Sequence, residues 1–312
     1  MLKGFAVAAT AGMFIVLLMG ATVTNTGSGE GCGRSWPLCH GQFIPEYAFE
    51  TMVEYSHRLV TGIEGLLIAG LSLGAWLSRR RLPEMKWLVP LMIVTLLLQS
   101  GMGAWAVMYP QTPPVMALHF GISLVCLATV FLTTRVIFEG DARPLDHAPP
   151  PPGGFRGLAW VTLAAIVGVA YLGAFMRHSG AELACHTWPL CNGELFPGLA
   201  GAAGVAFGHR LGALAATGLV LWLVLWAARC RQTRPDLARV ATIGLGLILL
   251  QSIIGGLVIL TRLTFASTIL HAAVMALLFI TVAELCRRVL PPATAAAPRP
   301  APAGTPALSA KA

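Results

Sequence analysis

The chain has 312 residues, of which 56% are hydrophobic and only 11% are charged. A soluble domain carries roughly 25% charged residues, so this composition excludes an ordinary soluble protein and predicts a protein that is solvated by lipid. The formal net charge of +8 could suggest a nucleic acid partner, but the placement of the charges argues against one. Most Lys and Arg residues fall in the segments predicted to lie on one side of a membrane, where anionic lipid attracts them.

Apolar runs long enough to cross a hydrocarbon core, which takes about 20 helical residues, recur along the whole chain. The eight runs cover residues 4–24, 52–78, 86–108, 115–138, 156–176, 202–229, 237–261 and 265–289. The distribution of basic residues predicts that both termini are cytoplasmic. The first run resembles a cleavable signal peptide, but the repeat described below provides it with a counterpart in mid-chain, so we interpret it as a helix.

The first four runs carry the first set of candidate functional residues. Cys32 and Cys39 lie in the predicted outside loop, Glu54 and His57 follow at the start of the second run, and His119 lies at the start of the fourth. Ionisable groups inside a membrane span are costly and usually mark function.

A Pro-rich linker, residues 139–155, separates these runs from the second set. Cys185 and Cys191 lie in the next outside loop, and His209 and His271 lie at the starts of the sixth and eighth runs. The tail from 290 to 312 is rich in Pro and Ala, and we expect it to be disordered.

The second set of runs repeats the first. An offset of 152 residues without a gap aligns the WPLC segment at 36–39 with that at 188–191, and it also aligns His57 with His209 and His119 with His271. The sequence therefore predicts an all-α membrane protein of eight transmembrane helices. These form two tandem, pseudo-symmetric four-helix bundles of parallel orientation, residues 1–138 and 156–289.

Each predicted bundle contains two histidines at similar depth near the outer surface, one pair being His57 and His119 and the other His209 and His271. Two imidazoles that face each other across a four-helix bundle are typical axial ligands of a haem iron. A zinc site is less favoured, because it needs three or four converging ligands. The alternative is that each histidine only hydrogen-bonds a neighbouring helix.

The repeat is broken beside one pair, since Glu54 lies three residues before His57 whereas its counterpart is Ala206. A carboxylate at that point can act as a general acid or base. Alternatively, Glu54 pairs with Arg58 one turn on or reaches the surface. Arg58 and Arg210 can each contact a haem propionate, and lipid phosphate is the competing partner.

The two loop cysteine pairs face the oxidising compartment, where disulfides persist. Their spacing is wider than in a CxxC redox motif. A structural disulfide is one interpretation of both pairs; for Cys32 and Cys39, beside Glu54, a thiol–disulfide role in the chemistry is the other.

The segments EYSHRLVTG at 54–62 and GHRLG at 208–212, the histidines 119 and 271, and both WPLC loops closely resemble haem A synthase. The resemblance covers residues 4–289, and the two cysteine pairs are similar to those of the bacterial form. It implies an enzyme of the bacterial plasma membrane that oxidises the C8 methyl group of haem O to a formyl group, through successive hydroxylations and loss of water, and so produces haem A for cytochrome oxidase.

The resemblance also implies site roles. His57 and His119 would hold haem O, with Glu54 beside them as the catalytic carboxylate, and His209 and His271 would ligate a haem b cofactor. An electron donor or acceptor is also implied, and candidate handover partners are haem O synthase and a cytochrome oxidase subunit. From the residues alone, two other functions stay open, a two-haem electron-transfer cytochrome and a haem carrier.

Overall fold

The computed structural model describes residues 1–142, 145 and 148–290. The long helices are α1 (Leu2–Asn25), α2 (Phe49–Arg79), α3 (Met85–Met108), α4 (Pro113–Glu139), α5 (Phe155–His178), α6 (Gly201–Arg229), α7 (Pro235–Leu260) and α8 (Phe265–Arg288). They match the eight predicted runs to within a few residues at most ends. The predicted disordered tail, apart from its first residue, lies outside the described residues, as do residues 143–144 and 146–147 of the predicted linker.

Each of these eight helices is long and apolar enough to span a membrane. A helix is favoured in lipid because it satisfies its own backbone hydrogen bonds. Pro113 and Pro235 stand at the starts of α4 and α7, where a missing N–H group does not break the helix. Leu66, Trp87 and Ile253 are exposed on the outside of the molecule, as lipid-facing side chains must be. The protein is a multi-pass membrane protein, as predicted.

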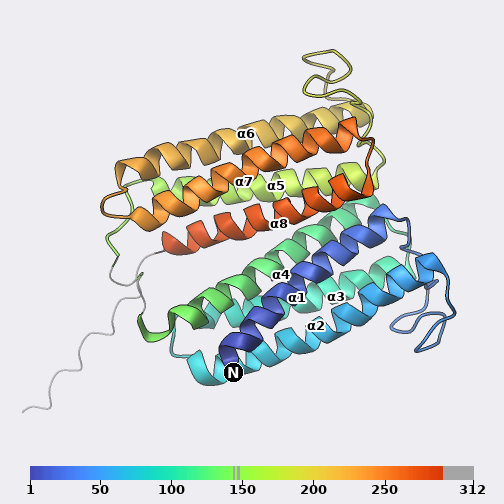
Figure 1. The fold of residues 1–312 in the computed structure, drawn as a ribbon, viewed down its shortest axis with the longest axis horizontal. Coiled ribbons are helices and arrows are strands. Elements are labelled where there is room, and N and C mark those ends of the chain that lie inside the picture. The colour runs from blue at the N-terminus through green and yellow to red at the C-terminus, as the bar shows by residue number, and fades with distance from the viewer. Residues whose placement is uncertain (143–144, 146–147, 291–312) are drawn as a thin grey trace, which may run out of the picture.

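The helices form two groups of four, α1–α4 and α5–α8 (Figure 1). In the first group α1 packs against α2 and α4, and α3 packs against the same two helices; the second group repeats this order with α5–α8. The groups meet where α4 contacts α5 and where α8 contacts α1 and α4. This arrangement places α4 and α8, which carry one histidine of each pair, at the centre of the molecule.

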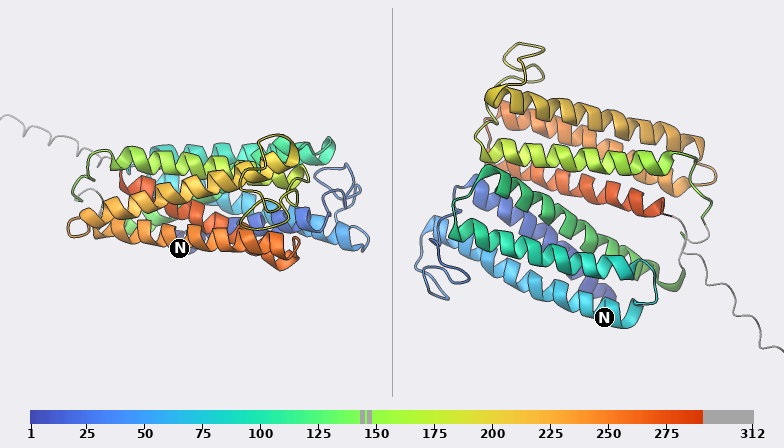
Figure 2. Two further views of the ribbon diagram at one scale, coloured as in Figure 1. Left: turned by 90° about the horizontal axis from the view of Figure 1, so that it is seen from above. Right: turned by 180° about the vertical axis from the view of Figure 1, so that it is seen from behind.

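The long loops 26–48 and 179–200, which contain the cysteine pairs, emerge from the same end of the molecule (Figures 1 and 2). We call this the disulfide end. The opposite end, with the N-terminus and residues 140–142 and 148–154, is the linker end. The two groups of helices therefore run in the same direction, as the sequence repeat predicts.

An ion-pair network joins the two groups at the linker end. Arg287 on α8 donates to both carboxylate oxygens of Glu284, at 2.8 and 2.9 Å, and to both of Glu139 at the end of α4, at 2.6 and 3.0 Å. Only 4% of the Arg287 side chain is exposed. Charges this deeply buried require paired, hydrogen-bonded partners, so the network fixes α8 against α4.

Candidate functional site

The structure brings the histidines together in two pairs near the disulfide end. His57 on α2 and His119 on α4 lie close enough to interact electrostatically, and so do His209 on α6 and His271 on α8. All four side chains are partly buried. Each pair thus consists of one imidazole from each of two helices of the same group.

Glycines on the other two helices of the first group adjoin its imidazoles. A Cβ atom at Gly20 on α1 would lie 3.4 Å from Nε2 of His57, and one at Gly103 on α3 would lie 3.7 Å from Cε1 of His119. The missing side chains leave room beside both rings.

The second group repeats this arrangement more tightly. A Cβ atom at Gly173 on α5 would lie 2.8 Å from Cε1 of His209, and one at Gly255 on α7 would lie 3.3 Å from Cε1 of His271. Gly20 and Gly173 are 153 residues apart, not 152, because the second cysteine loop is one residue shorter than the first.

These residues fit a haem held through axial imidazoles. The Nδ1 atoms of His119, His209 and His271 are buried without a hydrogen-bond partner among the described residues, so interhelix hydrogen bonds do not use the full capacity of these rings. Two of the rings do bond a neighbouring helix: Nε2 of His271 lies 3.1 Å from Nε2 of Gln251 on α7, and the ring of His209 bonds the backbone of Val169 on α5. Nowhere in the described chain do three or more His, Cys, Asp or Glu residues converge as a metal-binding group, which disfavours zinc.

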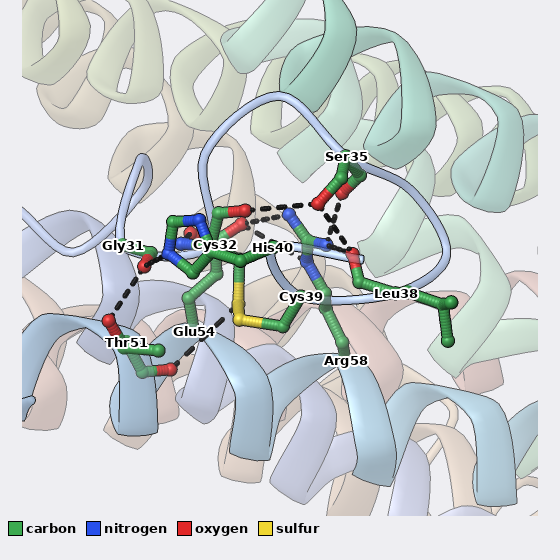
Figure 3. The surroundings of a disulfide bond; sticks show 9 residues. All are labelled: Gly31, Cys32, Ser35, Leu38, Cys39, His40, Thr51, Glu54 and Arg58. Carbon is green, nitrogen blue, oxygen red and sulfur yellow. Dashed lines mark hydrogen bonds and ion pairs between the residues drawn. A yellow bond between two sulfur atoms is a disulfide. The ribbon is translucent and has the colours of Figure 1, made fainter. Parts of the chain in front are cut away.

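Glu54 is buried beneath the first cysteine loop, with 4% of its surface exposed (Figure 3). Its Oε2 accepts a hydrogen bond from the backbone N–H of Cys32 at 2.8 Å, and its Oε1 accepts bonds from Nε and Nη2 of Arg58 at 3.1 and 2.5 Å. The pairing with Arg58 that the sequence left as an alternative is therefore present. It holds the carboxylate one turn from His57, and the equivalent residue in the second group is the buried Ala206.

Arg58 and Arg210 both bind the cysteine loops. Nη1 of Arg58 donates to the carbonyl oxygens of Ser35 at 2.7 Å and Leu38 at 2.9 Å (Figure 3). Arg210 donates in the same way, at 2.8–3.1 Å, to the carbonyl oxygens of Cys185, Pro189 and Leu190. These contacts attach each loop to the helix that carries a histidine. The expected contact with a haem propionate stays a prediction.

Both cysteine pairs form disulfides, Cys32 with Cys39 and Cys185 with Cys191. All four residues are almost fully buried, with at most 1% of their surface exposed. Because the Cys32 N–H group binds Glu54, the first disulfide supports the loop that holds the carboxylate. The second has no such neighbour, since Ala206 replaces Glu54.

Two residues without a role in the sequence analysis are notable in or beside the first group of helices. His178, at the end of α5, interacts with His119 across the boundary between the groups, and nothing in its sequence surroundings indicates this. Glu64 on α2 is 3% exposed, and neither of its carboxylate oxygens has a hydrogen-bond partner among the described residues. The sequence does contain a signal for Glu64, because a carboxyl group inside a predicted span is itself a mark of function.

Comparison with known proteins identifies the family. The sequence profile of the family described as "Cytochrome oxidase assembly protein" matches residues 3–283. The chain is 41% identical to a protein named "Heme A synthase" from Symbiobacterium thermophilum, over 93% of this chain and 96% of that protein. Proteins of the same name from Alkalihalophilus pseudofirmus and Geobacillus kaustophilus are each 40% identical, over 89% of this chain and 94% and 88% of the relatives. With its eight spans and paired histidines, the chain belongs to the family of cytochrome oxidase assembly proteins.

Proposed function

We propose that this protein is a haem A synthase, which oxidises the C8 methyl group of haem O to the formyl group of haem A. The observation that carries the proposal is the broken symmetry of the two histidine pairs. Both groups of helices provide two imidazoles and two adjacent glycines, but only the first provides a buried carboxylate one turn before a histidine, Glu54, where the second has Ala206. A reaction that moves protons requires such a group at one site only.

In this proposal residues 1–138 form the catalytic half, in which His57 and His119 hold haem O. The remaining half, residues 156–289, would hold haem b through His209 and His271. When bound, haem b supplies one-electron redox chemistry whose potential depends on its ligands and surroundings. The close approach of α4 and α8 supports an exchange of electrons between the halves.

Glu54 would act on protons at the edge of the substrate. Arg58 and the Cys32 N–H group restrain its carboxylate, so that it holds or releases a proton one turn from His57 without swinging into solvent. The disulfide-bonded loop covers this position, which excludes water from the reacting methyl group.

We further propose that the disulfide end faces the oxidising side of a bacterial plasma membrane, with both termini in the cytoplasm. Disulfides persist in that compartment, and basic residues such as Arg79, Arg80 and Arg81 lie at the linker end, as the positive-inside pattern requires.

The two halves can be tested separately. Purified protein should show a six-coordinate haem b spectrum that is lost in His209→Ala and in His271→Ala, because each change removes one axial ligand. If both variants keep their full haem b content, the cofactor assignment is wrong.

Glu54→Ala should keep haem b but stop haem A accumulation when a source of haem O is coexpressed. Extraction and chromatography of the pigments provide the measurement, and normal haem A output from the variant would rule out a catalytic Glu54. If the wild-type protein released haem O unchanged, it would instead be a haem carrier. If it kept two permanently bound, unaltered haems, it would be an electron-transfer cytochrome.

A further inference from the structure

A second carboxyl group lies deeper in the catalytic half. Glu64 follows His57 by seven residues on α2, which places it on the same helix face and about 10 Å closer to the linker end. Gly12 on α1 lies directly opposite, and a side chain there would collide with Oε2 of Glu64. The absence of a side chain at Gly12 therefore makes the space that the carboxyl group occupies.

Other polar groups adjoin Glu64. Cys126 follows His119 by seven residues on α4 and so lies at the same depth below its own histidine. Its thiol is fully buried, interacts with Thr95 on α3 and lies within electrostatic range of Glu64. We call Gly12, Glu64, Thr95 and Cys126 the mid-bundle polar site, to which each helix of the first group contributes one residue.

The second half has no such site. The residues at the four equivalent positions are Ala165, Ala216, Leu247 and Leu278. Ala216 and Leu278 are each 2% exposed, so the same helix packing is achieved there with apolar side chains. Packing therefore does not require a carboxyl group at this depth. Burying one without a hydrogen-bond partner is costly, which indicates that its partner is a ligand.

We propose that Glu64 determines substrate specificity by hydrogen-bonding the hydroxyl group that haem O carries on its hydroxyethylfarnesyl side chain. This inference rests on the proposed function and names a further contact for the same substrate. Haem b has a vinyl group in place of that side chain, so a site for haem b requires no polar partner there. The difference between the two haems thus matches the difference between the polar site of the first half and the apolar positions of the second.

The orientation of the substrate follows from its charges. The two propionates belong at the disulfide end, close to water, because burying a carboxylate in the hydrocarbon is unfavourable. In haem O the hydroxyethylfarnesyl group lies on the edge of the ring opposite the propionates, so that edge points toward Glu64. A neutral carboxyl group both donates and accepts hydrogen bonds, as a hydroxyl group does.

The test compares haem O with haem b as ligands of the catalytic half. Full-length protein with its second haem in place is supplied with both, and two quantities are measured. One is the ratio of haem O to haem b retained in the catalytic half. The other is the pair of KM for haem O and kcat for haem A formation.

Glu64→Ala, which introduces the residue of the second half, should raise KM about 10-fold, the effect of losing one hydrogen bond. It should lower the preference for haem O by a similar factor and change kcat little. Glu64→Gln keeps both donor and acceptor groups and should retain most of the preference. Ser72→Ala is the matched control, because Ser72 is an equally buried polar residue of α2 whose hydroxyl group donates to the carbonyl oxygen of Ile68 on its own helix.

An unchanged haem O preference in Glu64→Ala would overturn the proposal. So would a fall in kcat with unchanged KM, which would identify a proton-transfer group instead. If Glu64→Ala does not accumulate, Glu64→Gln decides. A Glu64→Gln protein that retains haem O and haem b in the ratio in which they were supplied would contradict the hydrogen bond. A wild-type protein that prefers haem O but makes no haem A would refute the proposed function and leave this inference standing.

Discussion

The glycine beside His209 provides the most direct test of the haem-holding geometry. Replacing Gly173 with Ala would put a methyl group 2.8 Å from Cε1 and 3.2 Å from Nδ1 of the imidazole. Carbon atoms normally approach to about 3.5–4.0 Å, so the ring would have to move by roughly 0.7 Å or more. A ring that ligates an iron atom cannot move that far without losing its alignment.

Overpacking of this kind costs about 1–3 kcal/mol, which corresponds to a loss of haem affinity of roughly 5- to 150-fold. We therefore expect Gly173→Ala to purify with less haem b and with a partly five-coordinate spectrum. The measurement is the haem content per protein, together with the absorption spectrum of the reduced protein.

A matched variant separates this effect from a general response to alanine. Gly168→Ala lies on the same helix with open space around the new methyl group. It should keep the wild-type haem content. If Gly173→Ala also kept it, with an unchanged six-coordinate spectrum, the imidazole would not be fixed where we infer, and the ligand role of His209 would be in doubt.

Three further predictions follow from the loops and the linker end. Arg287→Met should lower the stability by about 3–5 kcal/mol, because it leaves buried carboxylates unpaired; an unchanged thermal unfolding midpoint in detergent would contradict this. Cys32→Ala should reduce haem A output while haem b is retained. Cys185→Ala, in the loop without a buried glutamate, should not have this selective effect. If the ratio of haem A to haem b were equal in the two variants, the first disulfide would not be linked to the carboxylate. In a background without the three free cysteines, a membrane-impermeant thiol reagent should label Phe43→Cys but not Arg81→Cys in intact cells, and the opposite pattern would reverse the proposed orientation.

Much of the architecture is already determined by the sequence. Long apolar runs can only become helices in lipid, where every backbone N–H and C=O group needs an internal partner. Their number and the repeat of the WPLC loops therefore predict two parallel groups of four helices. The four histidines and Glu54 were also identifiable, because ionisable groups inside spans are rare and because Ala206 breaks the repeat.

Only the tertiary structure decided which groups meet. The sequence left Arg58 free to bind a propionate, lipid or Glu54, and the fold shows it bonded to Glu54 and to the loop. The contact between Gly12 and Glu64 joins residues 52 positions apart. No periodic pattern reports such a contact, since hydropathy shows which face of a helix is apolar but not which residue of a neighbouring helix lies opposite. That choice depends on the packing of side chains between helices, and it is the packing that leaves the carboxyl group of Glu64 without a hydrogen-bond partner among the described residues.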